Sequence, residues 1–314
     1  MPDLRITQAS ASMRMVGYLQ TDLTNLTNLQ EQAASGTSLM QPSDNPTATS
    51  EVLSLNAQIG RFQQYATNAG DGQSWLNTGA TALGNVTKAL DQVQTNLLSG
   101  ANASASDPST EKALSQDVLS LKQEILGLAA TTYNNRPVFS GTYGTAAYPQ
   151  ASASGVSDPT SSSYNPAVAY AYAGSNAPIT RMVAPGETTN VSMPGSQIFG
   201  SGTSSVFALL DTISTDLANG NTSGLSGSDL AQLKSAINTV TQATGSLGAL
   251  SASVTQNQTN ATDTVSNLQV QVGSISDANK AQVAAELDLA SASYQAALET
   301  TAHIIQPSLA QFLL

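Results

Sequence analysis

The chain has 314 residues, and its 10 Lys and Arg residues against 21 Asp and Glu residues give a formal net charge of −11. It contains no cysteine and one histidine, which excludes disulfide frameworks, thiolate zinc sites, thiol nucleophiles and paired-histidine metal sites. Charged residues make up only 10% of the chain, where a soluble domain usually has about 25%. The basic residues are scattered, so we expect no binding to nucleic acid or to an anionic membrane.

The first residues show no export signal of the cleaved type. Residues 1–20 lack the apolar stretch of a signal peptide, and no segment approaches the roughly 20 apolar residues of a membrane-spanning helix. If the protein leaves the cytoplasm, we expect it to do so without a cleaved signal peptide.

The N-terminal part of the chain predicts two helices separated by a break. An apolar stripe at helical spacing begins at Val16 and is followed by the sequence Q-P-S-D-N-P at 41–46. Two prolines predict a break there, and Ser43, Asp44 or Asn45 is expected to cap a helix that starts near Pro46.

The second helix carries a heptad pattern. Ten positions from Val52 to Leu83 alternate in steps of three and four, and nine of them are apolar, Gln73 being the exception. The pattern restarts at Val86 and continues to Leu97, which indicates either a stammer inside one helix or a break at Gly84.

The middle of the chain has a different character. After a break at 100–108, with Asp107 as a capping residue, a helical stripe at 114–128 is followed by a segment without heptads. Seven of the 12 prolines lie between 136 and 202, together with short alternating runs at 167–173, 179–183 and 188–193. These patterns predict an inserted β-rich module of short strands.

Helical stripes return at 206–217, 230–240, 265–275 and 283–305, with a glycine-rich break at 220–227. The fold class predicted is mainly α with an inserted β-rich module. We expect an elongated rod of long antiparallel helices built from both ends of the chain, with termini that become coiled-coil-like on assembly. Three domains are predicted, with residues 1–38 plus 280–314 as terminal assembly helices, 39–135 plus 205–279 as a helical rod, and 136–204 as the insert.

Both terminal segments have apolar stripes with few charges on the opposite faces, a weak composition for an isolated helix in water. We therefore expect them to order against partners. The predicted assembly interface consists of apolar and aromatic side chains from both ends, namely Ile6, Met13, Val16, Leu19, Leu23, Leu26, Val283, Leu287, Tyr294, Leu298, Ile304, Ile305, Leu309, Phe312 and Leu313.

Motifs for catalysis or ligand binding were sought without success. A hydrolase would need His303 as its base, yet the chain has no G-x-S-x-G elbow. The acidic residues form no D-x-[DN]-x-[DN]-G-x5-E calcium loop, and the glycine-rich patches lack the Lys-Ser/Thr pair of a phosphate loop. We expect no enzyme activity, no cofactor and no metal site.

Four segments resemble the bacterial flagellin family, and together they span nearly the whole chain. They are A-A-S-G-T-S-L-M-Q-P-S-D-N-P-T-A at 33–48, N-A-G-D-G-Q-S at 68–74, N-N-R-P-V-F-S-G-T at 134–142, and S-Y-Q-A-A-L-E-T-T-A-H-I-I-Q-P-S-L-A-Q-F-L at 293–313.

The resemblance implies a structural protein of the bacterial flagellum, exported by the flagellar type III route. It further implies an adaptor ring between the first hook-associated protein and flagellin, and an export chaperone that holds the C-terminal helix. The alternatives are a short filament flagellin and a secreted ligand-binding or hydrolytic protein.

Overall fold

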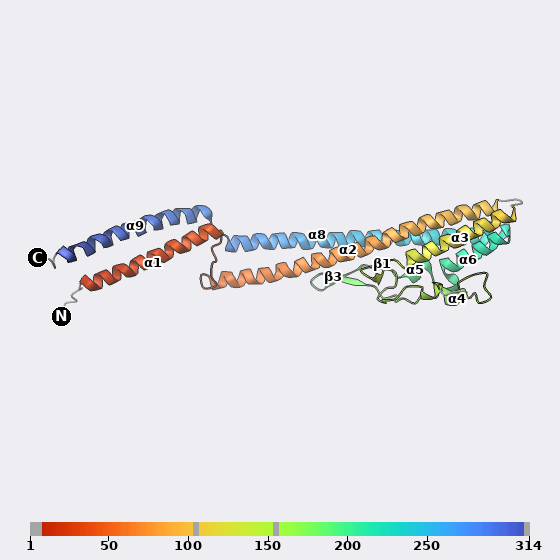
Figure 1. Ribbon diagram of the computed structural model, residues 1–314, viewed down its shortest axis with the longest axis horizontal. Coiled ribbons are helices and arrows are strands. Elements are labelled where there is room, and N and C mark those ends of the chain that lie inside the picture. The colour runs from red at the N-terminus through yellow and green to blue at the C-terminus, as the bar shows by residue number, and fades with distance from the viewer. Residues whose placement is uncertain (1–7, 103–106, 153–156, 311–314) are drawn as a thin grey trace. The chain divides into compact units, whose positions relative to one another are not determined.

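The computed structural model describes residues 8–102, 107–152 and 157–310, with the side chains of 303–310 left aside. Long helices dominate (Figure 1), as the sequence predicts. They are α1 (Gln8–Ser35), α2 (Pro46–Ala101), α3 (Pro108–Ala129), α6 (Val206–Ala218), α8 (Leu230–Ser276) and α9 (Lys280–Ala310).

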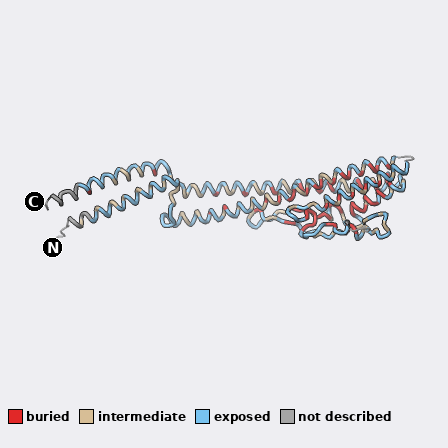
Figure 2. The backbone as a smooth tube through the Cα atoms, in the orientation of Figure 1, coloured by how far each residue is buried: buried red, intermediate tan, exposed pale blue. Residues whose placement is uncertain are grey.

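The chain divides into two compact units, one of residues 1–60 with 265–314 and one of residues 61–264. Figure 2 shows that buried residues concentrate in the 61–264 unit, while the terminal helices are mostly exposed or half-buried. The division of the chain into three domains stays a prediction.

Helix α2 is continuous through Gly84, so the heptad restart is a stammer within one helix. Its 56 residues correspond to a rise of about 84 Å. From Leu76 onward its seam is mostly buried. Gln73, the polar member of the seam, donates from Nε2 to Ser251 Oγ of α8 at 2.5 Å and accepts from Thr255 Oγ1 at 3.0 Å. The exception to the apolar pattern therefore serves as a polar link between the two helices.

Helix starts follow the expected capping chemistry. Asn45 Oδ1 accepts from Ala48 N at 3.1 Å, which identifies Asn45 as the cap of α2 among the three candidates. Asp44 instead accepts from Gln41 N at 2.8 Å and closes the preceding loop. Asp107 caps α3 through Ser109 N, as predicted.

The insert contains two antiparallel hairpins. Strands β1 (Thr132–Tyr133) and β2 (Arg136–Pro137) are joined by Asn134 and Asn135, both at positive φ. Strands β3 (Thr180–Ala184) and β4 (Glu187–Asn190) correspond to two of the three predicted strands.

The third prediction, a strand at 167–173, is wrong. Residues Pro166–Ala169 form the short helix α4, and Tyr170 follows it. Asn165 precedes a proline in the first helical position, a favourable helix start that outweighs the alternating pattern. The turn directs the Tyr170 hydroxyl to the buried Asp211 carboxylate, at 2.6 Å from Oδ2.

A buried ion pair fastens the insert to α3 and α6. Lys122 Nζ lies 2.6 Å from Asp211 Oδ1 and also donates to Ser157 O and to Tyr170 Oη. Tyr164 Oη donates to Asp211 Oδ2 at 3.0 Å. Burial, followed by the Asp211 carboxylate, raises the pKa of Tyr170, so this phenol stays a proton donor. Every charge in this cluster is matched, as burial requires.

The β3–β4 hairpin docks on α2 through the N-A-G-D-G-Q-S segment. Asn68 Nδ2 donates to Met182 O at 2.9 Å, and Asp71 Oδ2 accepts from Arg181 Nε at 2.8 Å. A Cβ atom on Gly72 would lie 2.8 Å from Val191 Cγ1. The motif therefore supplies a hydrogen bond, an ion pair and a gap to one hairpin.

This close approach predicts opposite effects for two glycine substitutions in α2. Gly84→Ala should raise the free energy of unfolding by about 1 kcal/mol, because alanine favours helix and a Cβ at Gly84 meets no atom within 4 Å. Gly72→Ala should lower it by about 1–3 kcal/mol, because the methyl group overlaps Val191. Urea unfolding followed by circular dichroism measures both.

The matched test adds Val191→Ala to each glycine variant. The unfavourable coupling should appear with Gly72→Ala and be absent with Gly84→Ala. Equal stabilisation by the two alanines would contradict the docking described above.

Candidate functional site

The candidate site is the surface of the antiparallel pair α1 and α9, which lie side by side within one unit (Figure 1). A short backbone link joins the end of α1 to the segment before α9. Ser38 N donates to Ser276 O at 2.7 Å, and Ala278 N donates to Gly36 O at 2.9 Å. Gly36 ends α1 with φ of 73°, a conformation that favours glycine.

The start of α9 is fixed by Asn279. Its Oδ1 accepts from Ala281 N at 3.2 Å and from Gln282 N at 3.4 Å, which caps the helix. The flagellin-like segment at 33–48 thus lies beside the 276–279 link, where its glycine, serine and Asx residues are used as turn residues.

One row of apolar side chains lies between the two helices. Val283 is buried, and the other members are half-buried. Spacings of three, four and seven residues place the members of each helix on one face. The row comprises Leu19, Leu26 and Leu29 of α1 with Val283, Leu287 and Tyr294 of α9.

A second set of large apolar side chains is exposed. Met13 is 72% exposed, Leu289 69% and Tyr18 64%. Val16, Leu23 and Leu298 are exposed as well. Exposed apolar groups gathered on one pair of helices mark a surface for association.

The sequence analysis missed Tyr18, Leu29 and Leu289 as members of this surface. Tyr18 and Leu289 fall between the positions of the heptad stripe, and such a stripe selects only residues facing a single neighbour. Scoring every large apolar residue on a charge-poor helix would have found all three.

The polar groups on α1 are satisfied within the helix. The hydroxyls of Thr21, Thr24 and Thr27 each donate to the carbonyl four residues earlier, at 2.9–3.0 Å. Among the residues the structure describes, neither α1 nor α9 takes part in an ion pair. Covering this surface therefore breaks few strong interactions with water or with other side chains.

A groove of about 510 Å³ lies along the pair. It is bordered by Asp22, Asn25, Asn28, Leu29 and Gln32 of α1 and by Glu286, Leu289, Ala290 and Ser293 of α9. The size and mixed lining suit side chains of another helix rather than a buried small molecule.

Six predicted interface residues cannot be placed in the same way. Ile6, Phe312 and Leu313 lie outside the described residues. Ile304, Ile305 and Leu309 belong to α9, but their side chains lie outside the description, as does that of His303.

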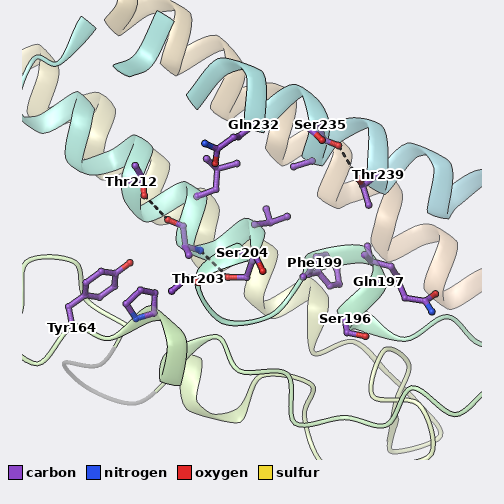
Figure 3. A pocket seen from close by; sticks show the side chains of 18 residues that line it. Tyr164, Ser196, Gln197, Phe199, Thr203, Ser204, Thr212, Gln232, Ser235 and Thr239 are labelled. Atoms are coloured by element: carbon purple, nitrogen blue, oxygen red, sulfur yellow. Dashed lines mark hydrogen bonds between the residues drawn. The ribbon is translucent and has the colours of Figure 1, made fainter. Parts of the chain in front are cut away.

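A second groove, of about 590 Å³, lies within the 61–264 unit between the insert and helices α6 and α8 (Figure 3). Neutral side chains such as Thr212, Gln232 and Thr239 line it, and Tyr164 is the one titratable residue in its lining. The Tyr164 hydroxyl is bonded to Asp211, and burial raises its pKa. The lining offers no nucleophile with an adjacent base.

Two further features were examined over the described residues. No group of three or more His, Cys, Asp or Glu side chains is arranged to hold a metal ion in that part of the chain. None of the helices there combines the length and apolar character needed to cross a membrane.

Comparison with known proteins relates the chain to flagellar components. Residues 6–144 match the bacterial flagellin N-terminal helical region. Flagellar hook-associated protein 3 of Salmonella typhimurium is 28% identical over 177 residues, which cover 56% of this chain and 50% of that protein. The chain thus matches about half the length of this curated relative.

Solved structures agree in fold. A protein described as a flagellar hook-associated protein from Vibrio parahaemolyticus superposes with a TM-score of 0.65 at 20% identity, over 74% of this chain and 100% of that one. The flagellar junction protein of Legionella pneumophila gives 0.56 at 14% identity, over 72% and 99% of the two chains.

The exposed terminal pair predicts a distinct proteolysis pattern. In a dilute monomer, limited digestion should remove both ends and leave a core near residues 40–275, because two helices with a single buried row are marginally stable in water. Mass spectrometry of a proteinase K digest identifies the limits, with the 61–264 unit as the internal standard of resistance. Protected ends in the dilute monomer would contradict this expectation.

Proposed function

We propose that this chain, which carries the bacterial flagellin N-terminal helical region over residues 6–144, is a structural adaptor of the bacterial flagellum. It would join the hook side to the flagellin filament by packing its terminal helices against those of neighbouring subunits. The observation that carries the proposal is the exposed apolar surface on α1 and α9 in a chain similar to hook-associated protein 3.

The proposed interface extends the exposed set described above. Met13, Val16, Leu23 and Leu298 would be buried by neighbouring subunits, while Leu19, Leu26, Val283, Leu287 and Tyr294 would hold α1 against α9. Ile6, Ile304, Ile305, Leu309, Phe312 and Leu313 would extend the same surface toward both chain ends.

Packing of this kind has a sufficient driving force. Burial of apolar surface contributes about 25 cal/mol per Å², or about 1.5–3 kcal/mol for each large side chain covered in full. The four exposed predicted residues alone would then supply several kcal/mol per subunit before ordering costs are subtracted. Repetition around a closed assembly multiplies that gain.

The specific partners belong to the same proposal. They are the first hook-associated protein on one side, flagellin on the other, and further copies of this chain in a ring. An export chaperone would cover the C-terminal helix beforehand, and the protein would reach the outside of the cell through the flagellar type III route without signal cleavage. Its role would be mechanical coupling, with no catalytic step.

A short filament flagellin is the second candidate, since its terminal helices would have the same character. A secreted ligand-binding or hydrolytic protein is less well supported, because the groove of Figure 3 lacks an acid–base pair.

Deletion of the gene in its source bacterium separates the first two candidates. Loss of an adaptor should leave hooks intact with flagellin released into the medium, whereas loss of a flagellin should leave the junction and cap proteins in place. Electron microscopy with immunoblots of the medium reads both outcomes. Normal filaments on the deletion strain would refute the adaptor role.

Complementation then tests the proposed surface. Leu298→Asp should fail to restore filaments, because a carboxylate would be buried without a partner. The matched variant Gln295→Asp carries the same new charge at another exposed position of α9 and should restore them. Both proteins should appear in the medium in similar amounts, which distinguishes failed assembly from failed export.

A further inference from the structure

The corner between α6 and α8, within the 61–264 unit, has an unusual backbone. After Gly220, at φ of 65°, the chain forms the short helix α7 (Thr222–Gly224) and a π-helical turn, η3 (Leu225–Asp229), which leads directly into α8. Asn221 Oδ1 accepts from Gly224 N at 3.2 Å. Turns of the π type are rare and frequently occur at functional positions.

This corner brings two carboxyl groups together. Asp216 lies in the last turn of α6, and Asp229 ends the π-helical turn with 2% of its surface exposed. Asp229 Oδ1 accepts from Ser228 Oγ at 3.2 Å, but Oδ2 is buried and has no hydrogen-bond donor among the described residues. Its polar neighbour is the carboxyl group of Asp216.

Two ionised carboxylates can only accept hydrogen bonds, so the buried oxygen of Asp229 would stay unsatisfied. A single proton changes this, since a protonated carboxyl donates to the other one. Burial, together with the bond to and the charge of Asp216, raises the pKa of Asp229.

The surroundings provide no compensating cation. On α3, Glu111 approaches Gly220, and Lys112 is exposed. On α6, Asp211 is paired with Lys122, and on α8, Lys234 is exposed. Residues 92–101 at the end of α2 carry no charge, and neither Asp216 nor Asp229 takes part in an ion pair within the described chain.

We propose that Asp216 and Asp229 share one proton and form a pH-sensitive latch that holds the end of α6 to the start of α8. In mildly acidic solution the shared proton satisfies the buried oxygen. When the pair loses this proton, two like charges repel each other in a poorly solvated corner, and the latch loosens.

The direction of the pH effect follows from linkage. A carboxyl whose pKa is raised in the folded state contributes stability that is fully present below the unfolded-state value. That contribution is lost as the pH rises through the folded-state value. The pair therefore stabilises the corner in acid and ceases to do so toward neutral and alkaline pH.

The substitution Asp229→Asn tests the latch, because an amide N–H donates to Asp216 at every pH without an added proton. Thermal unfolding by circular dichroism at about pH 5 and about pH 8 should show that the variant gains on the wild type as pH rises. At about pH 8 its Tm should exceed that of the wild type by about 2–4 °C. Asp216→Asn should behave in the same way from the other side.

Asp263→Asn is the control, since it removes an exposed carboxylate from α8 and should shift Tm equally at both pH values. The proposal is overturned if both corner variants lower Tm by the same amount at the two pH values. It is also overturned if millimolar Ca²⁺ raises the wild-type Tm at about pH 8 and leaves that of Asp229→Asn unchanged, because a cation would then hold the pair.

Discussion

A pair of helices can cover only one side of each member, and this constraint governs the terminal part of the protein. In α1 and α9 the covered side is the row from Leu19 to Tyr294, and the uncovered sides keep side chains such as Met13, Tyr18 and Leu289 in solvent. The 61–264 unit differs because α2, α3, α6 and α8 together with the insert surround an apolar core. A chain that closes its core in one unit and leaves an apolar surface in the other is suited to assembly.

The flagellin-like segments have physical roles that are visible in the structure. The segment at 68–74 receives the β3–β4 hairpin through Asn68, Asp71 and Gly72. The segment at 134–142 makes the β1–β2 turn with two asparagines at positive φ and sends Phe139 into the core. Motifs that looked like family signatures are therefore docking and turn elements that attach the insert to the long helices.

The sequence predicted the helices well, and it predicted the contacts between distant segments poorly. Periodicity located α2 because a seam longer than four heptads is a strong local signal, and Asp107 was found because capping is local too. Pairing of Lys122 with Asp211 depends on residues 89 positions apart, which no local pattern reveals. The strand expected at 167–173 failed for a related reason, since Tyr170 is oriented by a distant carboxylate. On the terminal helices the stripe identified the inner row, but residues exposed outside it needed the structure.

The scarcity of charge, which first excluded many kinds of chemistry, acquires a structural meaning. Both ion pairs in the described residues, Lys122 with Asp211 and Arg181 with Asp71, fasten the insert, and neither lies on α1 or α9. Charges placed on the terminal surface would lose hydration whenever a neighbour covered it, a cost that exposed ion pairs seldom repay. Threonine hydroxyls that bond to their own helix keep that surface polar enough for water while leaving few bonds to break on burial. Electrostatic specificity thus serves attachment within the subunit, and shape and apolar contact are left to serve association between subunits.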